Sequence, residues 1–262
     1  MLEQYLVVAL CASCASALTF FSGFGLGTLL LPIFALFFPI EVAIAMTGVV
    51  HLLNNLFKLA LVGRSAVMSV VLLFGLPAIA ASFGGALLMA RLSGLASLFR
   101  YTIGDTEFVV TPLGLLVGVL MICFALFELN STAVRAGGGR ALLPIGGVLS
   151  GFFGGLSGHQ GAFRSVFLLR AGLSKEGFIA TGIVCAVLVD AARLVIYGFD
   201  APTRWRSDQL LLIAVAVLAA FAGAYFGNRV LKKLTIAWLQ RIVCALLIAL
   251  GAAIACGWVA TR

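Results

Sequence analysis

Charged side chains are scarce in this chain. Asp, Glu, Lys and Arg make up 10% of its 262 residues, while hydrophobic residues make up 63%. A soluble domain averages about 25% charged residues, so the sequence has too little polar surface for a water-soluble protein. The net charge is +8, but no run of Lys and Arg resembles a nucleic-acid-binding patch. We expect these residues in short loops at the interface of a lipid bilayer.

Motifs for catalysis and metal binding are also missing. The sequence has no Walker-type phosphate loop, no Gly-x-Ser-x-Gly and no His-Glu-x-x-His. It has two histidines, His51 and His159, and its six cysteines all lie in apolar segments. We therefore expect no metal, no cofactor and no direct use of ATP by this chain, and we expect the cysteines to pack as small hydrophobic residues.

Long apolar segments dominate what is present. Spanning a bilayer takes about 20 helical residues, and we expect five helical segments in each half. They cover residues 4–21, 26–38, 42–62, 67–90, 109–128, 142–157, 162–171, 176–198, 208–231 and 235–260. The second segment of each half is short, which indicates a broken or re-entrant helix. The polar loop 91–108 is expected to hold a short interfacial helix. The fold class predicted is an all-α polytopic membrane protein with about 8–10 membrane segments.

The two halves repeat one pattern at a fixed offset. Ser22-Gly23-Phe24-Gly25-Leu26-Gly27 aligns with Ser157-Gly158-His159-Gln160-Gly161-Ala162, and Asn55 and Lys58 align with Asp190 and Arg193. We therefore expect a first membrane repeat over 1–128, a Gly-rich linker over 129–141 and a second repeat over 142–262. Many secondary transporters have two related halves with broken helices, and they bind substrate between them.

The glycine-rich breaks are candidate anion sites. A helix start presents unpaired N–H groups and partial positive charge, and Gly lets a ligand approach the backbone. The candidates are Ser22, Gly23, Gly25 and Gly27 at the first break and Ser157, Gly158, His159, Gln160 and Gly161 at the second. The alternative is that these glycines only allow helices to pack closely.

Polar side chains follow each break within otherwise apolar helices. Arg164 lies about one turn after the second break, and a guanidinium suits an oxyanion. Further candidates are His51, Asn54, Asn55 and Lys58 in one half and Asp190 and Arg193 in the other. We predict that they contact the substrate or take up protons. The alternatives are an Asp190–Arg193 ion pair, an Asp190–Arg164 pair, or hydrogen bonds that join helices.

Two stretches resemble a known family. The run Gly151-Phe-Phe-Gly-Gly-Leu-Ser-Gly-His-Gln-Gly-Ala-Phe-Arg-Ser and the run Arg170-Ala-Gly-Leu-Ser-Lys-Glu-Gly-Phe-Ile-Ala-Thr-Gly are similar to the TauE/SafE family of sulfite-exporter-like membrane proteins. The resemblance implies two homologous membrane halves and the transport of sulfite, sulfonates or related sulfur anions. It places the family's glycine motifs on Gly23, Gly25 and Gly27, and on Gly154, Gly155, Gly158 and Gly161. The chain departs from the pattern at His159 and Gln160.

The function expected is therefore secondary transport, with export favoured, of a small sulfur-containing anion. The protein is expected in the plasma (inner) membrane. Coupling of transport to protons or to the membrane potential is left open, and so is assembly into a homo-oligomer. One alternative is an intramembrane enzyme that uses His159 and Asp190 as an acid/base pair. Another is a membrane subunit of a larger complex.

Overall fold

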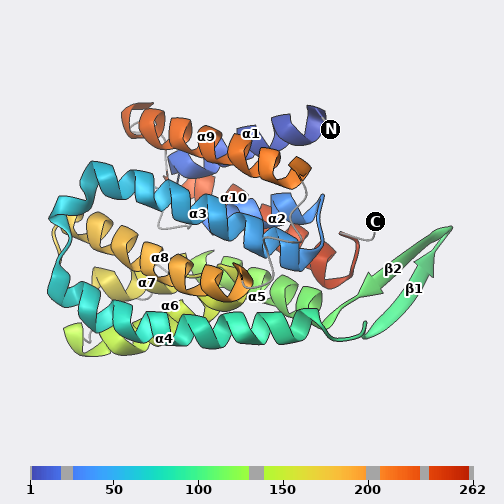
Figure 1. Cartoon of the computed structure of the whole chain (residues 1–262), viewed down its shortest axis with the longest axis horizontal. Helices are drawn as coiled ribbons and strands as arrows, with labels where there is room; N and C mark the ends of the chain where they lie inside the picture. Colours follow the sequence, from blue (N-terminus) through green and yellow to red (C-terminus); the bar gives the residue numbers. More distant parts are fainter. Residues whose placement is uncertain (1, 19–25, 130–138, 199–206, 231–235, 260–262) are drawn as a thin grey trace.

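The computed structural model describes residues 2–18, 26–129, 139–198, 207–230 and 236–259, and these ranges are almost entirely helical (Figure 1). The helices are α1 (Leu2–Leu18), α2 (Leu26–Ala35), α3 (Ile40–Val62), α4 (Met68–Ser93), α5 (Pro112–Leu129), α6 (Leu143–Ser157), α7 (Gly161–Leu169), α8 (Lys175–Gly198), α9 (Ser207–Val230) and α10 (Ile236–Ala255), with short 3-10 turns η1 (Gly63–Ser65) and η3 (Gly139–Leu142). A helix lies in each of the ten predicted segments. The expected helical fold class is confirmed.

The lengths of the helices fit a membrane. Within the described ranges, six helical stretches, which cover α3, α4, α5, α6, α8 and most of α9, are long and apolar enough to cross a bilayer. By contrast, α2 has ten residues and α7 has nine, which at about 1.5 Å per residue reach roughly half of the apolar core of a bilayer. These are the two short helices that the sequence predicts after its glycine-rich breaks.

The prediction of a helix in the loop 91–108 is wrong. The segment forms an antiparallel hairpin of β1 (Phe99–Ile103) and β2 (Thr106–Val110), which projects from the helical body (Figure 1). β1 alternates aromatic or β-branched residues with polar ones, and β2 ends in Phe-Val-Val, so both strands are rich in residues typical of strands. They meet at a two-residue turn in which Gly104 has φ +60, a conformation that favours glycine.

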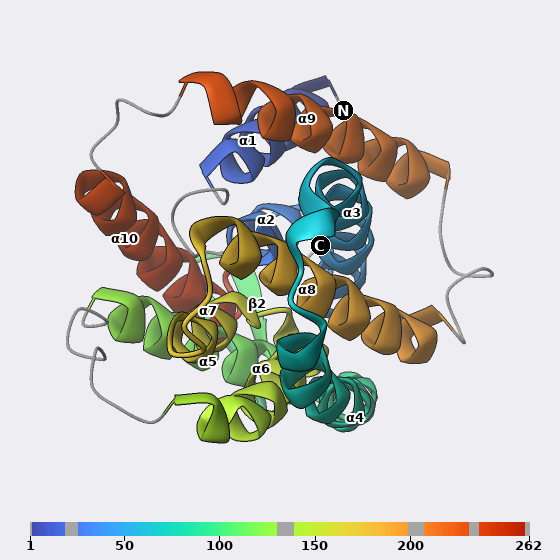
Figure 2. The same cartoon turned by 90° about the vertical axis from the view of Figure 1, so that its left-hand side faces the viewer.

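The two halves interlock. Helix α4 of the first half packs along α6 of the second, and α9 of the second packs along α1 of the first. The pairs α5–α10 and α3–α8 also join the halves, and Figures 1 and 2 show α1 and α9 on one side of the molecule and α4 and α6 on the opposite side. Helices α3 and α8, which carry the residues that the predicted repeat aligns, are therefore brought together in the middle.

Glycines set the close approach of α4 and α6. A Cβ atom at Gly147, Gly151 or Gly155 of α6 would overlap a backbone carbonyl oxygen of α4, and one at Gly85 of α4 would overlap the carbonyl oxygen of Phe152. Gly223 makes the same kind of contact between α9 and Ser13 of α1. Small residues that let helix backbones touch drive association inside membranes. Gly84 of α4 differs, because a Cβ atom added there would meet no atom within 4 Å.

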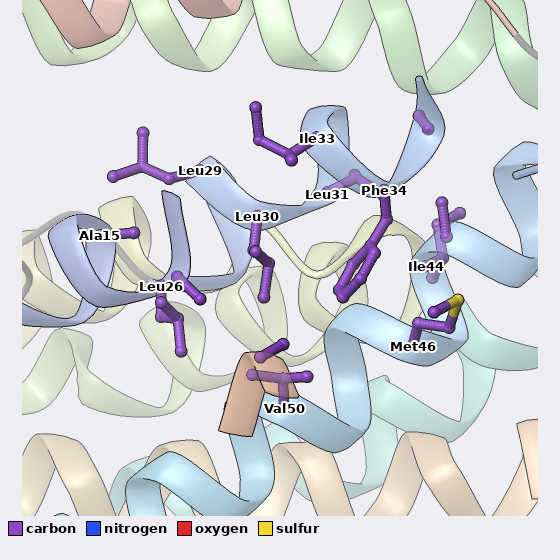
Figure 3. Close-up of a cluster of buried hydrophobic side chains, with 14 of the residues drawn as sticks. Ala15, Leu26, Leu29, Leu30, Leu31, Ile33, Phe34, Ile44, Met46 and Val50 are labelled. Atoms are coloured by element: carbon purple, nitrogen blue, oxygen red, sulfur yellow. The ribbon is translucent and has the colours of Figure 1, made fainter. Parts of the chain in front are cut away.

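Helix α2 lies at the centre of the larger apolar core. All ten of its residues are buried, as expected for a helix that is apolar on every side. Figure 3 shows Leu26, Leu30 and Phe34 of α2 facing Ile44, Met46 and Val50 of α3. This packing holds the short helix deep in the protein, next to the polar residues of α3.

Candidate functional site

The second glycine-rich break is sharply defined. Helix α6 ends at Ser157 because Gly158 adopts φ +83, a left-handed conformation typical of a glycine helix end. The hydroxyl of Ser150 donates to the carbonyl oxygen of Gln160 at 2.9 Å, which holds the turn against α6. Helix α7 then starts at Gly161, and its first N–H groups have no partner within the helix.

Asp190 of α8 is the centre of a buried polar network beside this break. Its Oδ2 lies 2.5 Å from Nδ1 of His51 on α3. Its Oδ1 lies 2.7 Å from Nη2 and 3.0 Å from Nε of Arg193, and it accepts a hydrogen bond of 2.9 Å from Nε2 of Gln160. The side chains of Asp190 and Arg193 are fully buried. The Asp190–Arg193 pair considered in the sequence analysis is therefore formed.

Arg164 of α7 joins the network through Gln160. Its Nη1 donates to Oε1 of Gln160 at 3.0 Å, so the suggested Asp190–Arg164 ion pair is not formed. Among the described residues, the network therefore contains two guanidinium groups, those of Arg164 and Arg193, and one carboxylate, that of Asp190. Lys58 of α3 is buried as well, and its charge and that of Arg164 repel each other. The region is rich in buried positive charge.

Gly27 of α2 lies against the same break. A Cβ at Gly27 would be 3.4 Å from the carbonyl oxygen of Gly158 and 3.7 Å from Cδ2 of His51. The first turn of α2 and the end of α6 are thus neighbours. The other candidates of the first break, Ser22, Gly23 and Gly25, lie outside the described residues.

Two adjacent asparagines of α3, Asn54 and Asn55, contact different partners. Nδ2 of Asn55 lies 3.1 Å from Nδ1 of His51 and 3.3 Å from its Nε2, so Asn55 belongs to the network. Asn54 faces the other way, and its Oδ1 accepts a hydrogen bond of 3.0 Å from Ser16 of α1. Asn54 thus takes the alternative role of a hydrogen bond between helices.

The amino-acid sequence has a match among known protein families. The family model described as sulfite exporter TauE/SafE matches residues 8–254. The chain belongs to the TauE/SafE family. No curated protein matches it. As a member of a family of sulfite exporters with six helical stretches able to span a bilayer, it is an integral multi-pass membrane protein.

The structure of this TauE/SafE protein separates its two histidines. His51 contacts Asp190, whereas Nδ1 of His159 lies 3.0 Å from the hydroxyl of Ser157, and its ring stacks on Phe124. Among the described residues, His159 makes no hydrogen bond with Asp190. The contact between His159 and Asp190 that the enzyme alternative requires is therefore not formed, and His51 contacts Asp190 instead.

Sequence reasoning missed several residues that position the network of this TauE/SafE protein. The Tyr197 hydroxyl donates to the carbonyl oxygen of Gly155, and Nη1 of Arg193 lies 3.4 Å from that of Gly154. Gly48 of α3 leaves space for Arg193, because a Cβ there would be 3.4 Å from its Cζ. The available signal was spacing, since Tyr197 follows Arg193 by one helical turn.

Proposed function

We propose that this TauE/SafE protein is a secondary transporter, working as an exporter, of small sulfur-containing anions such as sulfite or organosulfonates. The anion binds where the two glycine-rich breaks approach each other, next to Gly27, Gly158 and Gly161. Arg164 and Arg193 supply positive charge there, with Lys58 and Asn55 nearby. The observation that carries this proposal is the excess of guanidinium over carboxylate groups among the described residues of a buried network.

Physical chemistry supports an anion at this position. A buried charge inside a membrane protein is costly unless it is paired or lines a substrate pathway. Asp190 balances one cation, and an oxyanion with several acceptor oxygens would balance another through guanidinium hydrogen bonds. The start of α7 adds N–H groups and the positive end of a helix dipole. An inside-negative membrane potential drives a monoanion outward, by about 2.3 kcal/mol per 100 mV.

Flux in reconstituted liposomes tests the proposal. Purified protein is compared with protein-free vesicles for sulfite, sulfate, thiosulfate and a small sulfonate, each with and without a pH gradient. We expect saturable flux of at least one of these anions. Folded protein that moves none of them would refute the assignment of a sulfur-anion substrate.

Replacing Arg164 with alanine should reduce this flux by about tenfold or more, because a hydrogen bond to a charged group contributes about 1.5–3 kcal/mol. The fold should survive, since Gln160 keeps its bond to Asp190. Initial flux is measured at matched amounts of folded protein in the membrane. Arg100→Ala is the control, because Arg100 lies on the hairpin in an exposed pair with Glu107. Unchanged flux in the folded Arg164→Ala protein would remove this residue from the site.

Arg193→Ala is also expected to reduce transport, but it is a less specific test. Arg193 is fully buried against Asp190, so its loss leaves a buried carboxylate with one cation fewer. Breaking such a pair is strongly destabilising. We therefore expect both the yield of folded protein and the flux to fall.

A further inference from the structure

Contacts between loops place several helix ends together at the end of the molecule that lies opposite the hairpin (Figure 1). The 3-10 turn η1 joins α3 to α4 there, and a Cβ at Gly177 of α8 would be 3.6 Å from the carbonyl oxygen of Ser65 in η1. Nε of Arg140 in η3 donates to the carbonyl oxygen of Ala171, between α7 and α8, at 3.3 Å. The turns η1 and η3, the end of α7 and the start of α8 therefore share one end.

Helices α6 and α7 form a re-entrant pair. Arg140 lies just before α6 and Ala171 lies just after α7, so the hydrogen bond between them holds the outer ends of both helices side by side. The chain enters the protein through α6, turns at Gly158 and returns through α7 to the same end. Short helices that turn back in this way are common in transporters with two related halves.

The hairpin marks the opposite end. It connects the end of α4 to the start of α5. The end of α10 lies there too, because the Tyr101 hydroxyl of β1 donates to the carbonyl oxygen of Cys256 at 2.6 Å, and Nε1 of Trp258 donates to the Tyr101 hydroxyl at 2.7 Å. Tyr and Trp are typical of the boundary between lipid and water, so this end of the helices reaches a membrane surface.

Basic side chains are unevenly divided between the two ends. Outside the buried network, two of the described Lys and Arg side chains lie at the hairpin end, Arg91 in the last turn of α4 and Arg100 in β1, and Arg100 is paired with Glu107. The others lie toward the opposite end, which we call the basic end, and they are Arg64, Arg140, Arg170, Lys175 and Arg241. Only the return of α7 puts Arg140 and Arg170 on one side, so the excess of positive charge is a property of the folded chain.

We propose that the basic end lies on the cytoplasmic side of the membrane and binds the anionic phospholipid headgroups of that leaflet, with the hairpin on the opposite side. An excess of Lys and Arg in short loops marks the cytoplasmic side of membrane proteins. The anionic surface of that leaflet attracts basic side chains, by about fivefold in binding for each one. The re-entrant pair α6–α7 then opens toward the cytoplasm. The inference goes beyond the proposed function and holds whichever anion is transported.

The structure also suits contact with headgroups in detail. Arg64 and Lys175 are exposed, and Cζ of Arg170 lies 5.7 Å from the centroid of the Phe167 ring. Arg and Lys side chains at a membrane boundary lay their apolar stems along apolar surface and keep their charge among the headgroups. The aromatic ring beside Arg170 provides such a surface.

Labelling of single introduced cysteines tests the orientation. Asp105→Cys in the hairpin turn and Ser65→Cys in η1 both place a thiol at an exposed position, and both are made in a Cys256→Ser background because Cys256 is exposed at the hairpin end. Spheroplasts of expressing cells are treated with a membrane-impermeant maleimide before and after permeabilisation, and the Cys256→Ser protein alone gives the background. We expect the Asp105→Cys thiol to react from outside and the Ser65→Cys thiol to react only after permeabilisation. Any other pattern of external labelling would overturn the orientation.

Headgroup binding is tested with phosphatidylglycerol as the probe. The unfolding temperature of purified protein in detergent is recorded while phosphatidylglycerol, or uncharged phosphatidylcholine, is added. We expect phosphatidylglycerol to raise it more, and Arg64→Gln/Lys175→Gln to need about tenfold or more phosphatidylglycerol for the same rise. The matched control Arg91→Gln/Arg100→Gln, at the hairpin end, should respond like the wild type. Equal responses of the two double variants would overturn headgroup binding at the basic end, and neither outcome bears on anion flux.

Discussion

Replacing Asp190 with alanine is expected to lower the stability of the folded protein by about 3–5 kcal/mol, because it removes the carboxylate shared by three buried side chains. Arg193 would keep a fully buried guanidinium with no carboxylate, and His51 would lose its contact of 2.5 Å. Gln160 would also lose the acceptor of its side-chain amide. Thermal unfolding in detergent measures the effect, and a shift of about 10 °C or more is expected.

The hairpin provides a matched control for Asp190→Ala. Glu107 forms an ion pair with Arg100 at 3.5 Å, and both side chains are more than half exposed. Exposed pairs contribute about 0–1 kcal/mol, so Glu107→Ala should leave the unfolding temperature nearly unchanged. Equal shifts in the two variants would mean that the Asp190 network does not hold the helices together. In the double variant Asp190→Ala/Arg193→Ala, the unpaired guanidinium is gone, so the loss should be smaller than the sum of the single losses.

The helical plan was predictable from the sequence for a simple physical reason. Inside a bilayer every backbone polar group must be satisfied within the chain, so long apolar stretches have to be helices. Even the short α2 and α7 were predicted, because glycine-rich runs interrupt the apolar stretches at equivalent positions of the repeat. The hairpin was not predicted, because residues 91–108 lie outside this constraint and depend on strand pairing and the turn at Gly104.

The polar residues of the network could be proposed from sequence, but their partners could not. A charged residue in an apolar helix signals a functional or structural site, which pointed to Arg164, Asp190 and Arg193. The choice of partner depends on how α3, α7 and α8 pack. In the structure His51 takes the place next to Asp190 that the sequence left open to Arg164. The position of His159, away from Asp190, likewise follows from tertiary contacts with Ser157 and Phe124.

Replacing Gly151 with alanine should be one of the more damaging single-methyl changes at the contact between α4 and α6. The added Cβ would overlap the carbonyl oxygen of Ala78 on α4, and backbone atoms cannot rotate away as a side chain can. Overpacking typically costs about 1–3 kcal/mol and occasionally more, and a clash between two backbones belongs at the upper end. We expect a marked loss of monodisperse protein after purification and an unfolding temperature lower by several degrees.

Gly84→Ala on α4 is the control, because a Cβ at Gly84 meets no atom within 4 Å. An alanine is better than glycine in a helix by about 0.5–1 kcal/mol, so this variant should be as stable as the wild type or more so. A stable Gly151→Ala protein would show that α4 and α6 can separate without penalty.

Transport should fail along with stability in Gly151→Ala, because α6 also positions the site. The carbonyl oxygens of Gly154 and Gly155 accept hydrogen bonds from Arg193 and Tyr197 of α8, and Ser150 holds the break at Gln160. Pushing α6 away from α4 would shift these acceptors and the turn at Gly158 together. Residual folded Gly151→Ala protein should therefore show lower anion flux per molecule than Gly84→Ala, and equal flux would mean that the glycine contact supports the fold alone.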